Sequence, residues 1–312
     1  MKNLSRDLLK TLTTKLIGLY KIQKGDFGYY DNFDYWQKNG FHIIPNHYYQ
    51  PIPDTSTLKA EDFGKKDLVG IRMDDKEQLE ILDKIKDFKS EFTQFKKFSG
   101  SVNTQKDPNF YFDNLAFDTT DALLYYGMVR LIKPRKIIEI GSGWSTKIAA
   151  AACLKNGETK LDSIEPYPQP ILKNGFPGFS KLIEKKVEDV SLRFFESLRG
   201  GDILFIDSSH VSRIGGDVNH IFFEILPRLR KGVYVHIHDI FLPYDYPKDW
   251  VMKQRRFWSE QYILHAFLLF NDTFEIVYAK GYMNEKYPSK VKKVFPAFPP
   301  FGGGSMWIRK VK

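Results

Sequence analysis

Polar side chains gather at the ends of two apolar segments in the second half of this 312-residue chain. Asp207 and His210 follow the run GDILFI, and His238 and Asp239 end the run GVYVHIHD. A carboxylate beside such apolar residues needs a cation or hydrogen-bond donors, because burying it unpaired is costly. If the two runs are neighbouring strands, Asp207, His238 and Asp239 converge and could hold a divalent cation. The alternative is that the histidines are capping or core residues.

A second constellation is the glycine-containing turn EIGSGWST at residues 139–146. Gly141 and Gly143 permit a sharp strand-to-helix turn and let a ligand approach the backbone. Glu165 ends the next apolar run 22 residues after Gly143, the spacing at which a carboxylate binds ribose hydroxyls. Thr146 stands where a dinucleotide fingerprint has its third glycine, which argues against a nicotinamide cofactor. The alternative is a structural turn with a solvated Glu165.

The elements that position these residues alternate between short apolar runs and helical stretches from residue 136 onward. We expect strands at 136–140, 160–166, 201–207, 232–240, 274–280 and 305–311, and helices at 145–154, 218–229 and 257–270. Strands that alternate with helices predict a parallel sheet with helices on both faces. Such sheets bind ligands beyond the carboxyl ends of their strands, where both constellations fall.

The first hundred residues have a different pattern. Residues 1–25 predict a basic amphipathic helix, which can lie on a membrane surface or pack on its own domain or a second subunit. Residues 26–60 are rich in aromatic side chains and predict irregular chain, either a wrapping segment or a lid. Helices are expected within 74–98 and at about 118–132, the latter with Asp118 or Thr119 as N-cap.

The composition indicates a globular protein, with 42% hydrophobic residues and 15% aromatic residues. The single cysteine, Cys153, excludes an internal disulfide and a cysteine-rich zinc site, and it suits a reducing cytosol. The net charge of +9 is compatible with nucleic acid, anionic lipid or an acidic substrate, but the lysines are spread along the chain. Without a run of 18 apolar residues or a signal-peptide core, we expect a cytoplasmic protein.

Taken in order, the motifs EIGSGWST, SIEP, GDILFIDSSH and GVYVHIHDIF resemble those of the class I S-adenosylmethionine-dependent methyltransferases. Within that class the chain resembles the branch called methyltransferase family 24, over about residues 110–310. The resemblance implies a Rossmann-like, doubly wound seven-stranded sheet that ends in an antiparallel hairpin. It divides the chain into an N-terminal extension, 1–108, with lid, substrate or dimer contacts, and a methyltransferase domain, 109–312.

The same resemblance implies which residues bind the cofactor. The glycine turn binds the methionine part of S-adenosylmethionine and Glu165 binds the ribose, while a region after the expected third strand, 181–187, lies near the adenine. The implied cofactor-binding residues are Glu139, Gly141, Ser142, Gly143, Ser145, Thr146, Glu165, Val187 and Glu188.

Metal-dependent O-methyltransferases of the catechol type take their metal ligands from the corresponding strand ends. By that likeness Asp207, His238 and Asp239 are the metal ligands, and His210 is the base three residues after the first aspartate. The sequence departs from the catechol pattern twice, because His238 replaces a carboxylate and His210 replaces a lysine. These changes suggest a softer metal than magnesium, or none.

The expected chemistry is the transfer of a methyl group to a hydroxyl oxygen. His210 could accept the hydroxyl proton near neutral pH, because an unperturbed imidazole has a pKa of about 6.5. The loop FLPYDYPKDW follows the second polar cluster and offers Tyr244, Tyr246 and Trp250 as substrate contacts, although the loop could equally pack on the next helix. The aromatic content fits a small-molecule or glycan acceptor.

Three alternatives remain open at this stage. A nicotinamide-dependent oxidoreductase would share the fold, and a non-catalytic cofactor-binding module would share the glycine turn. A nucleic-acid methyltransferase agrees with the positive charge, but the sequence has no basic-aromatic stripe and no base-flipping motif. We therefore expect a small-molecule partner rather than a nucleic acid, with peripheral membrane contact and homodimerisation left open.

Overall fold

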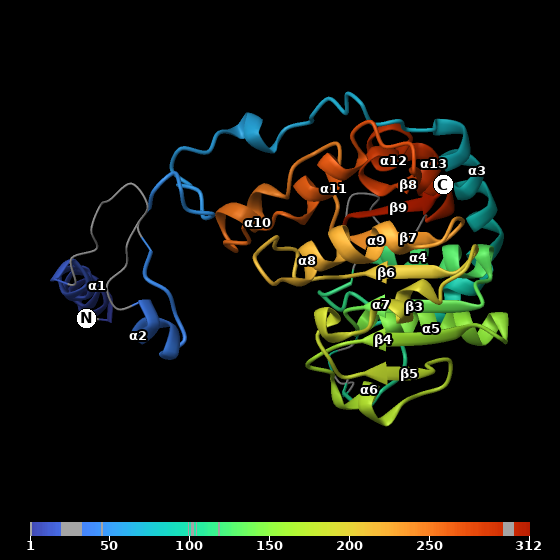
Figure 1. Cartoon of the computed structure of the whole chain (residues 1–312), viewed down its shortest axis with the longest axis horizontal. Helices are drawn as coiled ribbons and strands as arrows, with labels where there is room; N and C mark the ends of the chain where they lie inside the picture. The colour runs from blue at the N-terminus through green and yellow to red at the C-terminus, as the bar shows by residue number, and fades with distance from the viewer. Residues whose placement is uncertain are drawn as a thin grey trace. The chain divides into compact units, whose positions relative to one another are not determined.

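A seven-stranded sheet forms the centre of the computed structural model (Figure 1). Its strands lie in the order β5-β4-β3-β6-β7-β9-β8. The first five are mutually parallel, whereas β9 is antiparallel to both β7 and β8. The strands are β3 (Lys136–Ile140), β4 (Lys160–Ile164), β5 (Lys181–Ile183), β6 (Ile203–Ile206), β7 (Tyr234–His238), β8 (Phe274–Ala279) and β9 (Ser305–Lys310). The predicted Rossmann-like sheet with its antiparallel C-terminal hairpin is confirmed.

The structure describes residues 2–19, 33–44, 46–98, 100, 103, 105–117, 119–295 and 303–312. The chain divides into two units, Met1–Ala60 and Glu61–Lys312. Among the described helices, none combines the length and apolar character needed to cross a membrane.

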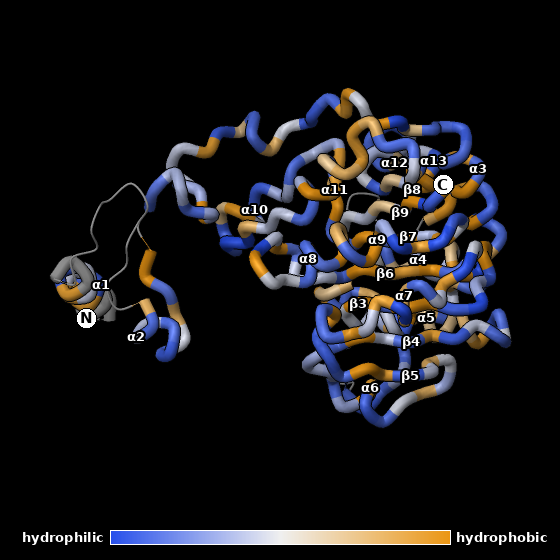
Figure 2. Tube along the Cα trace, in the orientation of Figure 1, coloured by the Kyte–Doolittle hydropathy of each residue, from blue (hydrophilic) through white to orange (hydrophobic). Residues whose placement is uncertain are grey.

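Alternate residues of the strands are buried on opposite faces of the sheet, because successive side chains of a strand point in opposite directions. Ile137, Phe205 and Trp307 belong to one apolar cluster, and Ile138 and Ile206 belong to the other. β6, with the sequence ILFI, is wholly apolar and is buried on both faces (Figure 2). Strands that are covered on both sides need such continuous apolar runs.

Each face of the sheet is covered by its own set of helices. The cluster around Phe205 includes side chains of α3 (Asp75–Ile85), α4 (Thr119–Ile132), α5 (Trp144–Asn156), α12 (Lys280–Lys286) and α13 (Pro288–Val294). The opposite cluster includes α7 (Leu192–Glu196), α8 (Asp217–His220), the π-helix η4 (Ile221–Ile225), α9 (Leu226–Arg228) and α11 (Glu260–Leu268). This is the expected arrangement of a doubly wound fold, and α12 and α13 lie in the segment between β8 and β9.

Short elements complete the larger unit, and the first of them begins at the boundary residue Ala60. These are η1 (Ala60–Phe63), η2 (Lys86–Gln94), β1 (Lys96–Lys97), β2 (Tyr111–Phe112), α6 (Pro170–Asn174), η3 (Val187–Asp189) and α10 (Lys248–Met252). β1 and β2 pair in parallel as a separate two-stranded sheet. Ile81, Leu82 and Ile85 of α3 are buried in the same cluster as α4. The predicted division at residue 108 therefore falls inside the larger unit, which begins at Glu61.

The smaller unit contains α1 (Lys2–Leu19) and α2 (Phe33–Lys38). None of its described side chains is buried, and Leu8 and Leu9 of α1 are 63% and 66% exposed. The rings of His47 and Tyr48 pack against one another in a tilted arrangement, with their centroids 4.2 Å apart. The predicted helix over 1–25 is confirmed over α1, whereas residues 20–32 and the proposed cap Asp118 lie outside the described residues.

Candidate functional site

The glycine turn lies between β3 and α5 and contacts the end of the neighbouring strand β6. Gly141 has a φ of +80°, and a Cβ atom at this position would lie 2.1 Å from the backbone oxygen of Asp207. Only glycine fits such a close approach and such a φ value. The strand order reverses between β3 and β6, which is the point where sheets of this kind bind ligands.

Glu165 follows β4 and contacts the glycine turn directly. Its carboxylate accepts hydrogen bonds from the backbone N–H of Ser142, at 3.3 Å, and of Tyr167, at 2.8 Å. The Oγ atom of Ser142 is buried and has no hydrogen-bond partner among the described residues. A buried hydroxyl without a partner is uncommon, and a polar ligand in the turn would satisfy it.

Two of the predicted cofactor residues lie beneath the turn and support it. Glu139 is fully buried and accepts hydrogen bonds from Tyr125 Oη, at 3.2 Å, and Ser163 Oγ, at 2.9 Å. Burial raises the pKa of Glu139 to about 7, although hydrogen bonds from Thr146, Ser163 and Tyr125 oppose the shift. Thr146 Oγ1 also accepts the backbone N–H of Gly143 at 3.0 Å. The turn is therefore fixed from below by a buried polar network.

The remaining predicted cofactor residues belong to the start of α5 and to η3. Ser145 is buried at the start of α5, and Gly143 is the N-cap of that helix. Val187 is buried in the apolar cluster beside β4, and Glu188 is half-buried; both belong to η3, which follows β5.

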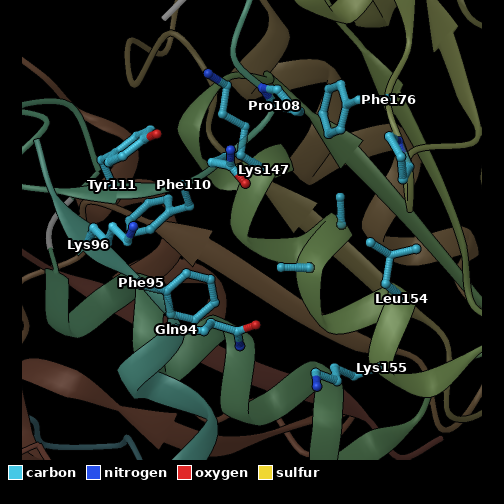
Figure 3. A pocket seen from close by; sticks show the side chains of 14 residues that line it. Gln94, Phe95, Lys96, Pro108, Phe110, Tyr111, Lys147, Leu154, Lys155 and Phe176 are labelled. Atoms are coloured by element: carbon cyan, nitrogen blue, oxygen red, sulfur yellow. The ribbon is translucent and has the colours of Figure 1, made fainter. Parts of the chain in front are cut away.

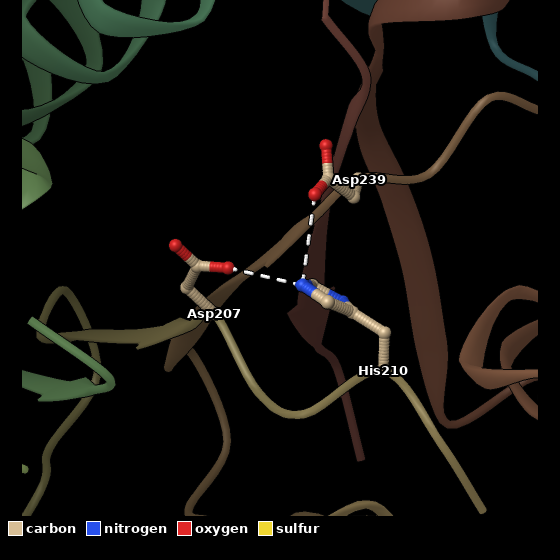
Figure 4. Close-up of side chains that lie close together, drawn as sticks. All are labelled: Asp207, His210 and Asp239. Carbon is tan, nitrogen blue, oxygen red and sulfur yellow. Dashed lines mark ion pairs between the residues drawn. The ribbon is translucent and has the colours of Figure 1, made fainter. Parts of the chain in front are cut away.

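Asp207, His210 and Asp239 come together at the ends of β6 and β7 (Figure 4). His210 Nε2 lies 3.2 Å from Asp207 Oδ1 and 3.6 Å from Asp239 Oδ2. One ligand atom from each residue lies within 4.8 Å of the others, close enough to share a metal ion. His210 and Asp239 have φ values of +60° and +54°. Strained backbone of this kind is concentrated at functional sites.

The pKa values of His210, Asp207 and Asp239 depend on burial and on the opposite charges that these residues place beside one another. Burial lowers the pKa of His210, but Asp207 and Glu260 outweigh it and raise the pKa well above 6.5. Burial raises the pKa of Asp207, but His238 and His210 bring it below its usual value. Burial raises the pKa of Asp239, which His238 and His210 offset only in part. The expectation of an unperturbed His210 is wrong, because the carboxylates around it favour the imidazolium.

His238, the third predicted metal ligand, lies outside the group that could share one ion. Its Nε2 atom is 3.6 Å from Asp239 Oδ1, and its ring packs 4.7 Å from the ring of Phe117. Its Nδ1 atom is buried without a partner among the described residues. The structure thus brings His210, and not His238, into contact with both aspartates.

Glu260 and Trp258 are site residues that the sequence analysis missed. Glu260, the first residue of α11, is fully buried, and its Oε2 atom lies 2.8 Å from His210 Nδ1. The ring of Trp258 lies 4.2 Å from the ring of His210. Both residues are about 50 positions from His210 in the sequence. The one sequence feature that could have suggested a buried polar contact is the acidic Glu260 at the start of an apolar helical segment.

The three predicted substrate residues occupy different environments. Trp250 contacts Trp258 edge to face at 5.3 Å, so it continues the aromatic wall beside His210. Tyr246 is buried, and its Oη atom accepts the backbone N–H of Gln261. Tyr244 is 37% exposed and lines another cavity together with Gly281 and Glu285. The ring of Tyr246 also contacts Trp258 edge to face at 6.0 Å. Trp250 and Tyr246 therefore both lie in the ring contacts that lead to His210, and Tyr244 does not.

A larger cavity, of about 640 Å³, lies on the outer side of α5 (Figure 3). Lys96, Lys147, Phe110 and Phe176 are among its lining residues, and none of the predicted site residues is. The Lys147 amino group donates to the backbone oxygen of Asp107 at 2.7 Å. This cavity is separate from the Asp207 group.

Comparisons with known proteins agree with this arrangement. The family-24 model, described as a methyltransferase domain, matches residues 138–240. An uncharacterised protein of Archaeoglobus fulgidus is 31% identical over 164 residues, which are 49% of this chain and 72% of that protein. The chain therefore contains a methyltransferase domain of this family over residues 138–240, as the motifs indicated.

Solved structures with a similar fold include two O-methyltransferases. TomG from Streptomyces achromogenes, in complex with S-adenosylmethionine, is 15% identical, with a TM-score of 0.42 over 78% of this chain and 93% of that chain. A putative O-methyltransferase from Klebsiella pneumoniae is 14% identical, with a TM-score of 0.37 over 78% and 92% of the two chains.

Proposed function

We propose that this protein transfers the methyl group of S-adenosylmethionine to a hydroxyl oxygen of a small-molecule or glycan acceptor. The close approach of Gly141 to the backbone of Asp207 carries the proposal, because the glycine turn then lies directly beside the polar group. A nucleotide-cofactor turn and a proton-accepting group at one switch point are the two parts that such a reaction needs.

The cofactor would be held by the turn and by the ends of the neighbouring strands. Gly141, Ser142, Gly143 and Ser145 would contact its methionine part, and Glu165 would accept hydrogen bonds from the ribose hydroxyls. Val187 and Glu188 would lie near the adenine, while Glu139 and Thr146 would support the turn from below. The buried Ser142 hydroxyl, which lacks a protein partner among the described residues, supports this fit. When bound, the cofactor supplies an electrophilic methyl group on a positively charged sulfur.

The acceptor oxygen would form a bond to the methyl carbon while the bond from that carbon to sulfur breaks. The hydroxyl proton would pass to His210 Nε2, the ring nitrogen that faces Asp207 and Asp239. Because those carboxylates favour the imidazolium, the base role requires opposing positive charge nearby. The enzyme would otherwise act by holding oxygen, methyl and sulfur in line.

Asp207 and Asp239 would hold a divalent cation if one takes part. Two carboxylates at the ends of adjacent strands are a suitable donor set for a hard cation. Such a cation would lower the pKa of the acceptor hydroxyl and orient it. His238 is left out of this ligand set, because its nitrogens lie outside the group that could share one ion.

The acceptor would lie against the aromatic side chains near His210. Trp258 and Trp250 form a continuous series of ring contacts from His210 outward. Flat apolar walls of this kind suit aromatic rings and sugar faces. A cytoplasmic location, homodimerisation and a lid or contact role for the N-terminal residues remain predictions of the sequence.

A methyl-transfer assay tests the proposal. The purified chain is incubated with methyl-labelled S-adenosylmethionine and a panel of catechols, phenols and oligosaccharides. We expect label in at least one hydroxyl acceptor and none when Asp207→Asn replaces the wild type. A chain that binds the cofactor and methylates no oxygen in the panel, but methylates nitrogen or RNA, would contradict O-methylation. Reduction of NAD⁺ by the chain would support the oxidoreductase alternative.

A further inference from the structure

Glu260 is a buried carboxyl group whose side chain contacts the imidazole of His210. Its Oε2 atom lies 2.8 Å from His210 Nδ1. Its Oε1 atom is buried and has no hydrogen-bond partner among the described residues. A buried carboxyl group that is only half satisfied costs stability, and such groups are usually retained for a specific purpose.

The start of α11 holds His210 at three further points. The backbone N–H groups of Ser259 and Glu260 donate to the backbone oxygen of His210, at 2.8 and 3.0 Å. Ser259 Oγ also accepts the backbone N–H of Ser212. The ring of Trp258 covers one side of the imidazole at 4.2 Å. These contacts fix both the backbone of His210, with its positive φ, and the plane of its ring.

The two nitrogens of this ring therefore face different partners. Nδ1 faces Glu260, whereas Nε2 faces Asp207 and Asp239 at 3.2 and 3.6 Å. The hydrogen bond made by one imidazole nitrogen determines the state of the other, because a carboxylate at Nδ1 requires a hydrogen there. Glu260 also lies in the first turn of α11, where the helix dipole stabilises a carboxylate.

We propose that Glu260 is a positioning residue: it accepts the Nδ1–H of His210 and keeps Nε2 directed at Asp207 and Asp239. This inference rests on the proposed function only in taking His210 Nε2 as the proton-accepting atom. Glu260 itself would not contact the acceptor or the cofactor.

Nuclear magnetic resonance of the wild-type chain, labelled with ¹⁵N-histidine, tests the proposal without an acceptor. His210→Gln identifies the His210 signals by their loss. We expect the Nδ1 atom of His210 to carry a hydrogen over the whole accessible pH range, with a strongly deshielded proton resonance. A neutral ring that carries its hydrogen on Nε2 instead would overturn the proposal.

Glu260→Gln keeps the shape of the side chain and removes its charge. We expect the Nδ1 proton resonance to move upfield, and methyl transfer to fall by about 10- to 100-fold, as for other residues that orient a functional imidazole. Glu260→Asp, which keeps the charge, should recover part of the resonance shift. An unchanged His210 spectrum in Glu260→Gln would contradict the proposal.

Asp202→Asn is the matched control for loss of a buried carboxylate. Asp202 is also buried, but it lies at the opposite end of β6, where it pairs with Arg135. We expect Asp202→Asn to destabilise the fold and to leave the His210 resonances unchanged. If the chain binds no S-adenosylmethionine, the proposed function fails, but the hydrogen position on His210 is still measured independently.

Discussion

The backbone N–H of Ser142 donates to the carboxylate of Glu165 at 3.3 Å, which joins the glycine turn after β3 to the acid at the end of β4. The two residues are 23 positions apart in the sequence and belong to two different motifs. Their contact means that a ligand lying over the turn also lies beside the carboxylate. The ribose and the methionine part of one cofactor would therefore be recognised by a single continuous surface.

Removing either aspartate of the polar group should abolish cation binding. We expect Mn²⁺ to bind the wild type and to lose measurable affinity in Asp207→Asn and in Asp239→Asn, because each removes one of the two proposed oxygen ligands. Calorimetric titration with Mn²⁺ alone measures this. Asp249→Asn, which changes an exposed carboxylate paired with Lys253, should bind normally.

Substitution of His238, the third predicted metal ligand, distinguishes its role from that of His210. His238→Gln should keep Mn²⁺ binding within a few-fold of wild type, since its nitrogens lie outside the group that could share one ion. Loss of binding in His238→Gln with retention in Asp207→Asn would show that the ligand set is wrong.

Loss of the proposed base should slow turnover without weakening the cofactor. His210→Ala is expected to lower the rate of methyl transfer by about 10²- to 10⁴-fold, the usual effect of removing a positioned base. Affinity for S-adenosylhomocysteine should stay close to wild type. His265→Ala, a half-buried histidine of α11, is the control. A fully active His210→Ala enzyme would assign the proton to another acceptor.

The buried Glu139 predicts a pH-dependent stability. Burial raises its pKa to about 7, from an ordinary value of 4.5. Between these pH values the folded state binds more protons than the unfolded state, so the wild type loses stability as the pH rises through this window. Glu139→Gln removes this titration. The unfolding free energy of this variant, relative to that of the wild type, should therefore increase by at most about 3 kcal/mol between pH 5 and pH 8.

Chemical denaturation at a series of pH values measures this difference. Glu184→Gln, a half-exposed carboxylate paired with Lys173, should show no comparable trend. The unfolding free energy of Glu139→Gln minus that of the wild type should rise with pH. A fall in this quantity with rising pH would mean that Glu139 is ionised more easily in the folded state.

The N-terminal unit should be dispensable for cofactor binding. All of the proposed cofactor residues lie in Glu61–Lys312, and that unit contains the buried clusters on both faces of the sheet. Deleting residues 1–60 should leave the affinity for S-adenosylhomocysteine unchanged. Sedimentation and vesicle flotation of the same variant show whether these residues mediate dimerisation or membrane contact. A several-fold loss of cofactor affinity would place part of the cofactor site in the deleted residues.

The local sequence pattern predicted the positions of the strands and the polar residues at their ends, because these depend on residues that are close in the sequence. The strand at 136–140 is observed with the predicted ends, because its apolar run is bounded by Pro134 and the glycine turn. Asp207 and Asp239 could be paired because both end strands of one parallel sheet. The other strands end one to four residues before the predicted ends, because the last residues of each predicted strand lie in the loops and helices that follow.

Contacts between residues that are distant in the sequence could not be predicted from the local pattern. Glu260 reaches His210 because the start of α11 is hydrogen-bonded to His210 in the loop that follows β6. Whether His210 or His238 faces the aspartates depends on the positive φ of His210, which a sequence pattern does not reveal. Tyr246 is buried, and its hydroxyl accepts the backbone N–H of Gln261, a contact across 15 positions that the loop sequence does not reveal. Its contact with a substrate stays a prediction.

Calorimetric titration of the purified chain with S-adenosylhomocysteine, and in parallel with NAD⁺, tests the central claim most directly. We expect the adenosyl ligand to bind with micromolar-range affinity, NAD⁺ not to bind, and Glu165→Ala to weaken the adenosyl ligand by about 1.5–3 kcal/mol, the scale of a hydrogen bond to a charged group. The exposed Glu184→Ala should bind as the wild type does. Binding of NAD⁺ in place of S-adenosylhomocysteine, or an adenosyl affinity that is unchanged in Glu165→Ala, would contradict the cofactor site described above.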